Sequence, residues 1–157
     1  AAADDRRVWR NLEERFPHPY SAADADWWVT HASADGDALD LAIEIDGRAA
    51  GGIGVRPGPG VRGRTGVLGY WLGAAHWGRG IASATVAAFV DAVFATERYV
   101  RLEATVFAWN PASMRLLEKC GFTREGVLRA AVWKDDALID AVMYARIATV
   151  DAVQARR

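Results

Sequence analysis

The chain has 157 residues, 52% of them hydrophobic and 25% charged, a composition that fits one globular domain and excludes wholesale disorder. Its 19 lysines and arginines nearly balance its 20 aspartates and glutamates, which leaves no basic footprint for nucleic acid. The single Cys120 excludes an internal disulfide and a zinc site, and no apolar run reaches the roughly 18 residues of a membrane span.

Two short helices are predicted at the start of the chain. An apolar stripe beside charged residues predicts a helix over residues 1–16, which Pro17 and Pro19 end. Ser21 is the predicted N-cap of a second helix, because its hydroxyl can accept a backbone N–H of the first turn. Residues 31–37 are polar and predict a turn.

Alternating apolar residues and a turn signal predict a hairpin in the next part of the chain. Strands are expected over 39–45 and 49–55, joined by Asp46-Gly47, a sequence typical of two-residue hairpin turns. Residues 56–65 are rich in glycine and proline and predict a mobile hairpin loop. A further strand is expected over 67–72.

The remainder of the chain alternates between helix and strand patterns. The expected elements are a helix over 81–96, a strand over 100–107, a helix from Pro111 to its C-cap Gly121, and strands over 122–133 and 138–147. The resulting order, α α β β β α β α β β, predicts an α/β fold with a mixed sheet and helices on its faces, in one domain.

A glycine-containing turn between a strand and a helix, residues 76–83, is the first segment that indicates chemistry. Gly78 and Gly80 let a ligand approach the backbone, and the unpaired amides and dipole at a helix start favour an anion such as pyrophosphate. A tight turn without a ligand is the alternative. The segment lacks the lysine of a P-loop, and Ser83 stands where a dinucleotide fingerprint has its third glycine.

The second informative segment runs from Asn110 to Phe122. Asn110 ends a strand, and Ser113 lies in the first turn of the following helix. Taken alone, the segment is explained by a capped helix start, since asparagine is a good N-cap.

Together the two segments resemble the GNAT superfamily of acyl-CoA-dependent N-acyltransferases, and more closely its RimJ/RimL-type branch. The family's acetyl-CoA loop is matched by Trp77-Gly78-Arg79-Gly80-Ile81-Ala82. The branch pattern N-x-x-S-x-x-x-x-E-K-x-G-F is matched by Asn110, Ser113, Glu118, Lys119, Gly121 and Phe122.

The resemblance covers residues 8 to 147 and implies one N-acetyltransferase domain over 1–157. In such a domain a mostly antiparallel central sheet, flanked by helices, is split in the middle to hold acyl-CoA. The first strand of the family is then absent from this chain, and residues 148–157 form a C-terminal tail.

Acetyl-CoA is the cofactor that this resemblance implies. Backbone amides of the loop would hold its pyrophosphate, Leu72 and Asn110 would contact its pantetheine arm, and Ser113 would protonate the leaving thiolate. The residues assigned to the cofactor in this way are Leu72, Trp77, Gly78, Arg79, Gly80, Ile81, Ala82, Ser83, Asn110 and Ser113.

The reaction implied is direct attack of a neutral amine on the thioester, which requires removal of a proton. Where relatives carry a carboxylate as base, this chain has Val67 and Val132. The remaining candidates are Glu103, Asp140 and Glu44, with a chain of water molecules as an alternative. Glu103 is equally explained as a solvated or salt-bridged strand residue.

The acceptor stays open between a protein or peptide α-amine and a small amine. About a tenth of α-amines are neutral at pH 7, against about one lysine in a few thousand, so an α-amine needs less help from a base. Arg62 and Arg64 lead to the hypothesis of an acidic acceptor. The candidates to line an apolar acceptor cleft are aromatic, with a place in the core as the alternative for each: Trp27, Trp28, Tyr70, Trp109 and Trp133.

We therefore expect a cytoplasmic protein, monomeric or homodimeric, whose partners are acetyl-CoA and an amine acceptor, without nucleic acid, membrane or metal. A non-catalytic module that binds or senses acyl-CoA is the alternative from another functional class.

Overall fold

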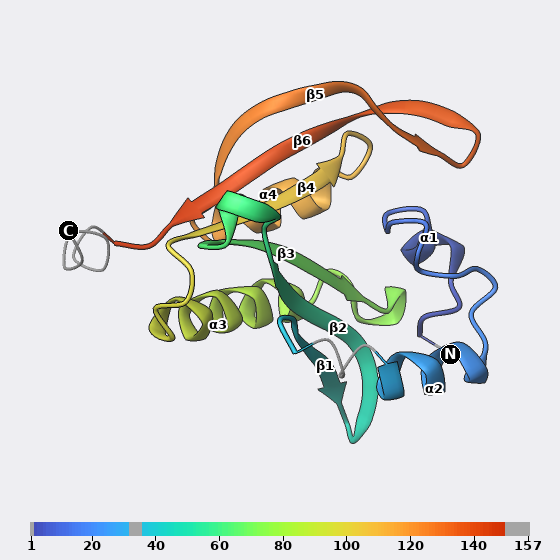
Figure 1. The fold of residues 1–157 in the computed structure, drawn as a ribbon. Helices are drawn as coiled ribbons and strands as arrows, with labels where there is room; N and C mark the ends of the chain where they lie inside the picture. The colour runs from blue at the N-terminus through green and yellow to red at the C-terminus, as the bar shows by residue number, and fades with distance from the viewer. Residues whose placement is uncertain (1, 32–35, 150–157) are drawn as a thin grey trace.

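Six strands form one sheet in the order β1-β2-β3-β4-β6-β5 in the computed structural model, which describes residues 2–31 and 36–149 (Figure 1). All neighbouring strands are antiparallel except β3 and β4. The elements are α1 (Arg6–Trp9), α2 (Ala22–His31), β1 (Leu39–Ile45), β2 (Arg48–Pro57), the 3-10 helices η2 (Gly60–Arg62) and η3 (Ala74–His76), β3 (Thr65–Leu72), α3 (Ile81–Ala95), β4 (Arg101–Phe107), α4 (Pro111–Lys119), β5 (Thr123–Lys134) and β6 (Ala137–Ile147). The predicted order of helices and strands and the mixed, mostly antiparallel sheet are confirmed.

Turn residues set several of the strand boundaries. Asp46 and Gly47 have φ angles of 52° and 73°, the geometry of a type I′ two-residue turn, and β1 has the predicted bounds. The predicted glycine-rich loop is shorter than expected, because β2 continues to Pro57 and β3 begins at Thr65. Parts of the predicted polar turn and C-terminal tail, residues 32–35 and 150–157, lie outside the described residues.

The helix predicted over residues 1–16 is wrong, since α1 covers only Arg6–Trp9. The Trp9 ring centroid lies 3.7 Å from Lys134 Nζ at the end of β5, whereas Phe16 packs edge-on against Trp71 of β3 with centroids 5.3 Å apart. These partners lie on different strands of the sheet, and the chain turns after α1 to reach both of them.

Lys134 links this N-terminal segment to the β5–β6 hairpin. Its side chain is only 2% exposed, and its ammonium lies 3.6 Å from Glu14 Oε1 as well as against the Trp9 ring. Arg6 adds an ion pair of 2.6 Å to Asp135 in the hairpin turn. The ammonium has no hydrogen-bond acceptor among the described residues, so the ring and the carboxylate together offset the cost of its burial.

The sheet opens between its two central strands. Residues 65–67 of β3 pair with residues 101–103 of β4, and the register ends at Val67 opposite Glu103. Beyond that point β3 keeps its pairing with β2 to Leu72, while β4 keeps its pairing with β6 to Phe107. The two strands therefore diverge, which confirms the predicted split in the middle of the sheet.

Helices α3 and α4 cover the face of the sheet that holds the main core (Figure 1). Leu102 of β4, Val90 of α3 and Leu117 of α4 are completely buried there. On β4 the next residue, Glu103, points to the opposite face, because side chains alternate along a strand. None of the helices within residues 2–31 and 36–149 has the length and apolar character needed to cross a membrane.

Leu102→Ala is expected to lower the free energy of unfolding by about 2–5 kcal/mol, because it removes a fully buried side chain from a closely packed core. Urea unfolding measures the change. Val67→Ala, at a residue that is 39% exposed on the neighbouring strand, is the control, with an expected change of at most about 1 kcal/mol. Equal losses for both variants would contradict the placement of the core on the α3 face.

Candidate active site

The turn before α3 presents unpaired backbone amides at an open surface. Gly78 and Gly80 have left-handed φ angles of 73° and 77°, which glycine adopts without strain. The first α-helical hydrogen bond of α3 runs from Ala84 N–H to Gly80 C=O, so the amides of residues 81–83 have no acceptor within the helix. A Cβ placed on either glycine would meet no described atom within 4 Å. The turn can therefore receive an anion the size of a phosphate group.

Trp77 fixes this turn to the end of β3. Its indole Nε1–H donates a hydrogen bond of 2.7 Å to the carbonyl oxygen of Leu72. Gly73 N–H donates to Ala50 C=O on the β2 side, and backbone groups alternate between the two edges of a strand. The N–H and C=O of Leu72 therefore point to the edge that faces β4. Because its carbonyl accepts the indole, its N–H is the group left for a ligand in the split.

Asn110 and Ser113 stand at the start of α4. The Asn110 side-chain oxygen accepts the Ser113 backbone N–H at 3.2 Å, so the predicted N-cap is present. The cap uses the oxygen of Asn110, which leaves the amide nitrogen as the ligand-binding part of this side chain. At the other end the predicted C-cap is shifted by one residue, since Cys120 ends the helix and Gly121 follows with a φ of 81°.

A hydrogen bond connects the two sides of the split. Tyr70 of β3 and Ser113 of α4 share a hydrogen bond of 2.7 Å between their hydroxyl oxygens. Burial is the main cause that raises the pKa of Tyr70 to about 12; the Ser113 hydrogen bond lowers it and Cys120 raises it. The sequence offers Tyr70 only as a candidate to line the acceptor cleft, so its contact with Ser113 was not predicted. The signal was its alternation with Leu68 and Leu72, which places all three on the α3 face.

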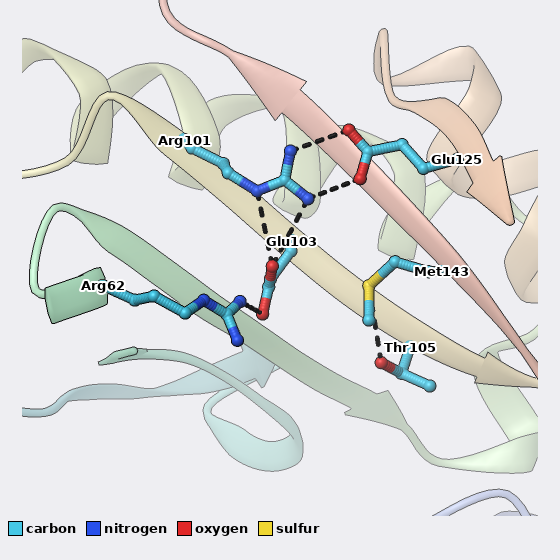
Figure 2. Close-up of polar contacts among 6 residues, drawn as sticks. All are labelled: Arg62, Arg101, Glu103, Thr105, Glu125 and Met143. Atoms are coloured by element: carbon cyan, nitrogen blue, oxygen red, sulfur yellow. Dashed lines mark hydrogen bonds and ion pairs between the residues drawn. The ribbon is translucent and has the colours of Figure 1, made fainter. Parts of the chain in front are cut away.

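Glu103 lies in a charge network on the opposite face of the sheet (Figure 2). One of its oxygens accepts from Arg62 of η2, and the other accepts from Arg101 at 3.4 Å. Arg101 also holds Glu125 of β5 with two hydrogen bonds of 2.7 and 2.5 Å, which lowers the pKa of Glu125. Glu103 is thus a salt-bridged residue where β3 and β4 part, and the network attaches η2 to the sheet.

The arginines of the predicted loop are engaged within the protein. Arg62 binds Glu103, and Arg64 donates to the backbone oxygen of Glu97 at 3.1 Å. These contacts argue against the hypothesis that the two guanidinium groups select an acidic acceptor. Arg79 of the glycine turn is exposed, with one nitrogen 3.4 Å from His76 Nδ1.

The other two carboxylate candidates lie apart from Glu103. Asp140 Oδ1 accepts the backbone N–H of Ala130 at 2.8 Å, where β5 bulges and Ala130 has a positive φ of 50°. Its contact therefore stabilises the bulge. Glu44 is exposed on the edge strand β1, and β2 separates it from the split. Among the three carboxylates, Glu103 alone stands at the point where the central strands part.

A family model described as an acetyltransferase (GNAT) domain matches residues 1–123 of this chain. The chain belongs to the GNAT family. YjcK, a probable N-acetyltransferase of Bacillus subtilis (strain 168), is 40% identical over 81 residues, which are 48% of this chain and 45% of YjcK. The ribosomal-protein-serine acetyltransferase of Escherichia coli (strain K12) is 33% identical over 84 residues, 54% of this chain and 47% of that protein.

The chain thus spans about half the length of these curated relatives. The structure of Mycobacterium smegmatis RimJ in complex with CoA-disulfide is similar with a TM-score of 0.72 and 30% identity, covering 80% of this chain and 62% of that one. The predicted likeness to the RimJ/RimL-type branch is confirmed.

Aromatic side chains of the GNAT domain gather on the N-terminal segment. Phe16, Tyr20, Trp27 and Trp28 line a shallow pocket, and Phe16 connects it to Trp71 of β3. Trp27 and Trp28 are 57% and 36% exposed, so the core role left open for these two tryptophans is excluded. Within residues 2–31 and 36–149, no three histidine, cysteine or acidic residues lie close enough together to hold a metal ion.

Proposed function

We propose that this protein transfers the acetyl group of acetyl-CoA to the α-amine at the N-terminus of a peptide or protein. One observation carries the proposal: the split between β3 and β4 has a turn with unpaired backbone amides at the end of one wall and the Tyr70–Ser113 hydroxyl pair across it. Likeness to the ribosomal-protein-serine acetyltransferase of Escherichia coli supports a protein acceptor.

The cofactor would lie along the α3 side of the split. Amides of residues 78–83 would bind the pyrophosphate, where the α3 dipole adds about 0.3–1 kcal/mol per charge. The N–H of Leu72 and the amide nitrogen of Asn110 would bind oxygens of the pantetheine arm. Trp77 would hold the turn against Leu72. Arg79, which is exposed, would contact a phosphate of CoA from the solvent side of the turn.

The reaction would be a direct acetyl transfer. The neutral amine nitrogen attacks the thioester carbon, the new N–C bond forms, and the C–S bond breaks with its electron pair going to sulfur. The sulfur takes a proton from the Ser113 hydroxyl. The proton that the nitrogen loses returns to Ser113 through the base or solvent, so the products are the acetylated amine and the CoA thiol.

Paired isosteric changes test which carboxylate acts as the base. Glu103→Gln is expected to lower kcat for an α-amine acceptor by at most about 10-fold at pH 7, because roughly a tenth of the amine is already neutral. The loss should disappear as the pH rises through the amine pKa of about 8, because the amine is then already neutral before it attacks and solvent can take the proton lost afterwards. Asp140→Asn is the matched variant, because its amide oxygen still accepts the Ala130 N–H.

Measurements of kcat between pH 6 and 9 show which variant loses activity, and melting temperatures show that both variants are folded. A pH-dependent loss in Asp140→Asn with none in Glu103→Gln would assign the base to Asp140. Full activity of both variants would leave proton removal to water.

Mass spectrometry after incubation with acetyl-CoA tests the function itself. The acceptors are a peptide with a free α-amine and one internal lysine, and a panel of small amines, with a blank that lacks acceptor. One acetyl group on the α-amine is the expected product. Transfer to small amines alone would overturn the peptide acceptor. No transfer, together with a melting temperature raised by acetyl-CoA, would favour a non-catalytic binding module.

A further inference from the structure

We propose that Tyr70 is a positioning residue, which holds the Ser113 hydroxyl so that its proton points at the sulfur of the cofactor. This inference rests on the proposed role of Ser113 as the proton donor to the leaving thiolate. Tyr70 itself transfers no proton in this scheme. Its contribution is the direction of the Ser113 O–H bond.

The Ser113 residue is fixed from two directions. Its backbone N–H donates to the Asn110 side chain at 3.2 Å, which sets the first turn of α4. Its hydroxyl oxygen lies 2.7 Å from the Tyr70 hydroxyl, which comes from the opposite wall of the split. A serine hydroxyl otherwise rotates to suit its surroundings. The contact with Tyr70 removes that freedom at the atom that would act on the sulfur.

The donor in this pair follows from the chemistry of the two groups. A phenol is a stronger acid than an alkyl alcohol and hence the better hydrogen-bond donor. The burial of Tyr70 raises its pKa to about 12, so the phenol keeps its proton at the pH values at which amines react. With Tyr70 donating to the Ser113 oxygen, the proton of Ser113 is left to point at a third atom. In the split that atom is the sulfur.

The same bond permits an opposite explanation, in which it closes the split and must break before the cofactor enters. The two explanations differ in their effect on affinity. A positioning bond leaves CoA binding unchanged when it is removed. A closing bond competes with CoA, so its removal tightens binding.

The first experiment needs no acceptor and uses CoA as the probe. The NMR shift of the thiol-bearing carbon of 13C-labelled CoA, bound to the protein, is followed as a function of pH. A hydroxyl that donates to sulfur stabilises the thiolate and lowers the pKa of the bound thiol. We expect Ser113→Ala to raise that pKa by roughly one pH unit, the size expected for a hydrogen bond to a charged group, and Tyr70→Phe to raise it in the same direction.

Tyr144→Phe is the matched control. Tyr144 is a buried tyrosine on the same α3 face as the partly buried Tyr70, and its hydroxyl donates at 2.9 Å to Glu118, another side chain of α4. Its loss should leave the pKa of the bound thiol unchanged. A thiol pKa in Tyr70→Phe equal to that of the unmodified protein, or a tighter dissociation constant for CoA, would overturn the proposal.

A double-mutant cycle on kcat completes the test with the acceptor found for the protein. Tyr70→Phe alone should lower kcat by about 10- to 100-fold without a change in KM for acetyl-CoA. In the Ser113→Ala background it should cost nothing more, because it acts through Ser113. The same loss in both backgrounds would mean that Tyr70 acts independently. If the acceptor screen finds no turnover in the unmodified protein, the proposed function is refuted, and the thiol titration still decides the role of Tyr70.

Discussion

Gly80→Asp is expected to weaken the binding of acetyl-CoA by between about 5-fold and about 1,000-fold. Gly80 directly precedes α3, and the backbone amides of residues 81–83, which follow it, are among those proposed to bind the pyrophosphate. A unit negative charge 4 Å from a phosphate costs about 1 kcal/mol in water and about 4 kcal/mol near a protein surface.

Gly80→Asn separates charge from shape. Asparagine has the same size and tolerates the left-handed φ of 77° about as well. Isothermal titration with acetyl-CoA should therefore show a clearly smaller loss for Asn than for Asp. Equal affinities for the two variants would contradict an anion site at this turn.

Ser113→Ala is expected to lower kcat by about 100- to 10,000-fold, the usual range for loss of a proton donor. The dissociation constant for acetyl-CoA should stay the same, because Ser113 contributes its backbone N–H to the helix cap and the variant keeps that N–H. Steady-state kinetics and titration measure the two quantities separately.

Thr96→Ala serves as the control for this variant. It also removes a hydroxyl at the end of a helix, since Thr96 donates at 2.7 Å to Val93 C=O after α3. It lies at the end of α3 away from the glycine turn, so kcat should not change. Equal losses of kcat and affinity in Ser113→Ala would show that this serine binds the cofactor instead of serving as a proton donor.

Local signals in the sequence were sufficient for most of the fold. Strand β1 and its turn at Asp46 and Gly47 follow from alternation and from residues that accept positive φ. The N-terminal helix could not be predicted in the same way. Its length depends on Trp9 reaching Lys134 and Phe16 reaching Trp71, and both partners are remote in sequence.

The candidate site also has parts that local sequence patterns predict and parts that depend on remote contacts. The glycine turn and the Asn110 cap are each formed within a few residues, so their patterns were visible in the sequence. Tyr70 and Ser113 are 43 positions apart, and Arg62 and Glu103 are 41 apart. These pairs form because two strands run side by side and then diverge, and no local pattern encodes that geometry.

The burial of Lys134 bears on what the proposed activity does to the protein itself. The sequence carries two lysines, Lys119 and Lys134, and arginine supplies all its other side-chain cations apart from histidine. Lys134 lies beneath the Trp9 ring and is 2% exposed, whereas Lys119 is exposed at the end of α4. Arginine side chains do not accept acetyl groups as amines do. If the protein acetylated its own side chains in the presence of acetyl-CoA, Lys119 would therefore be the one accessible lysine of this sequence.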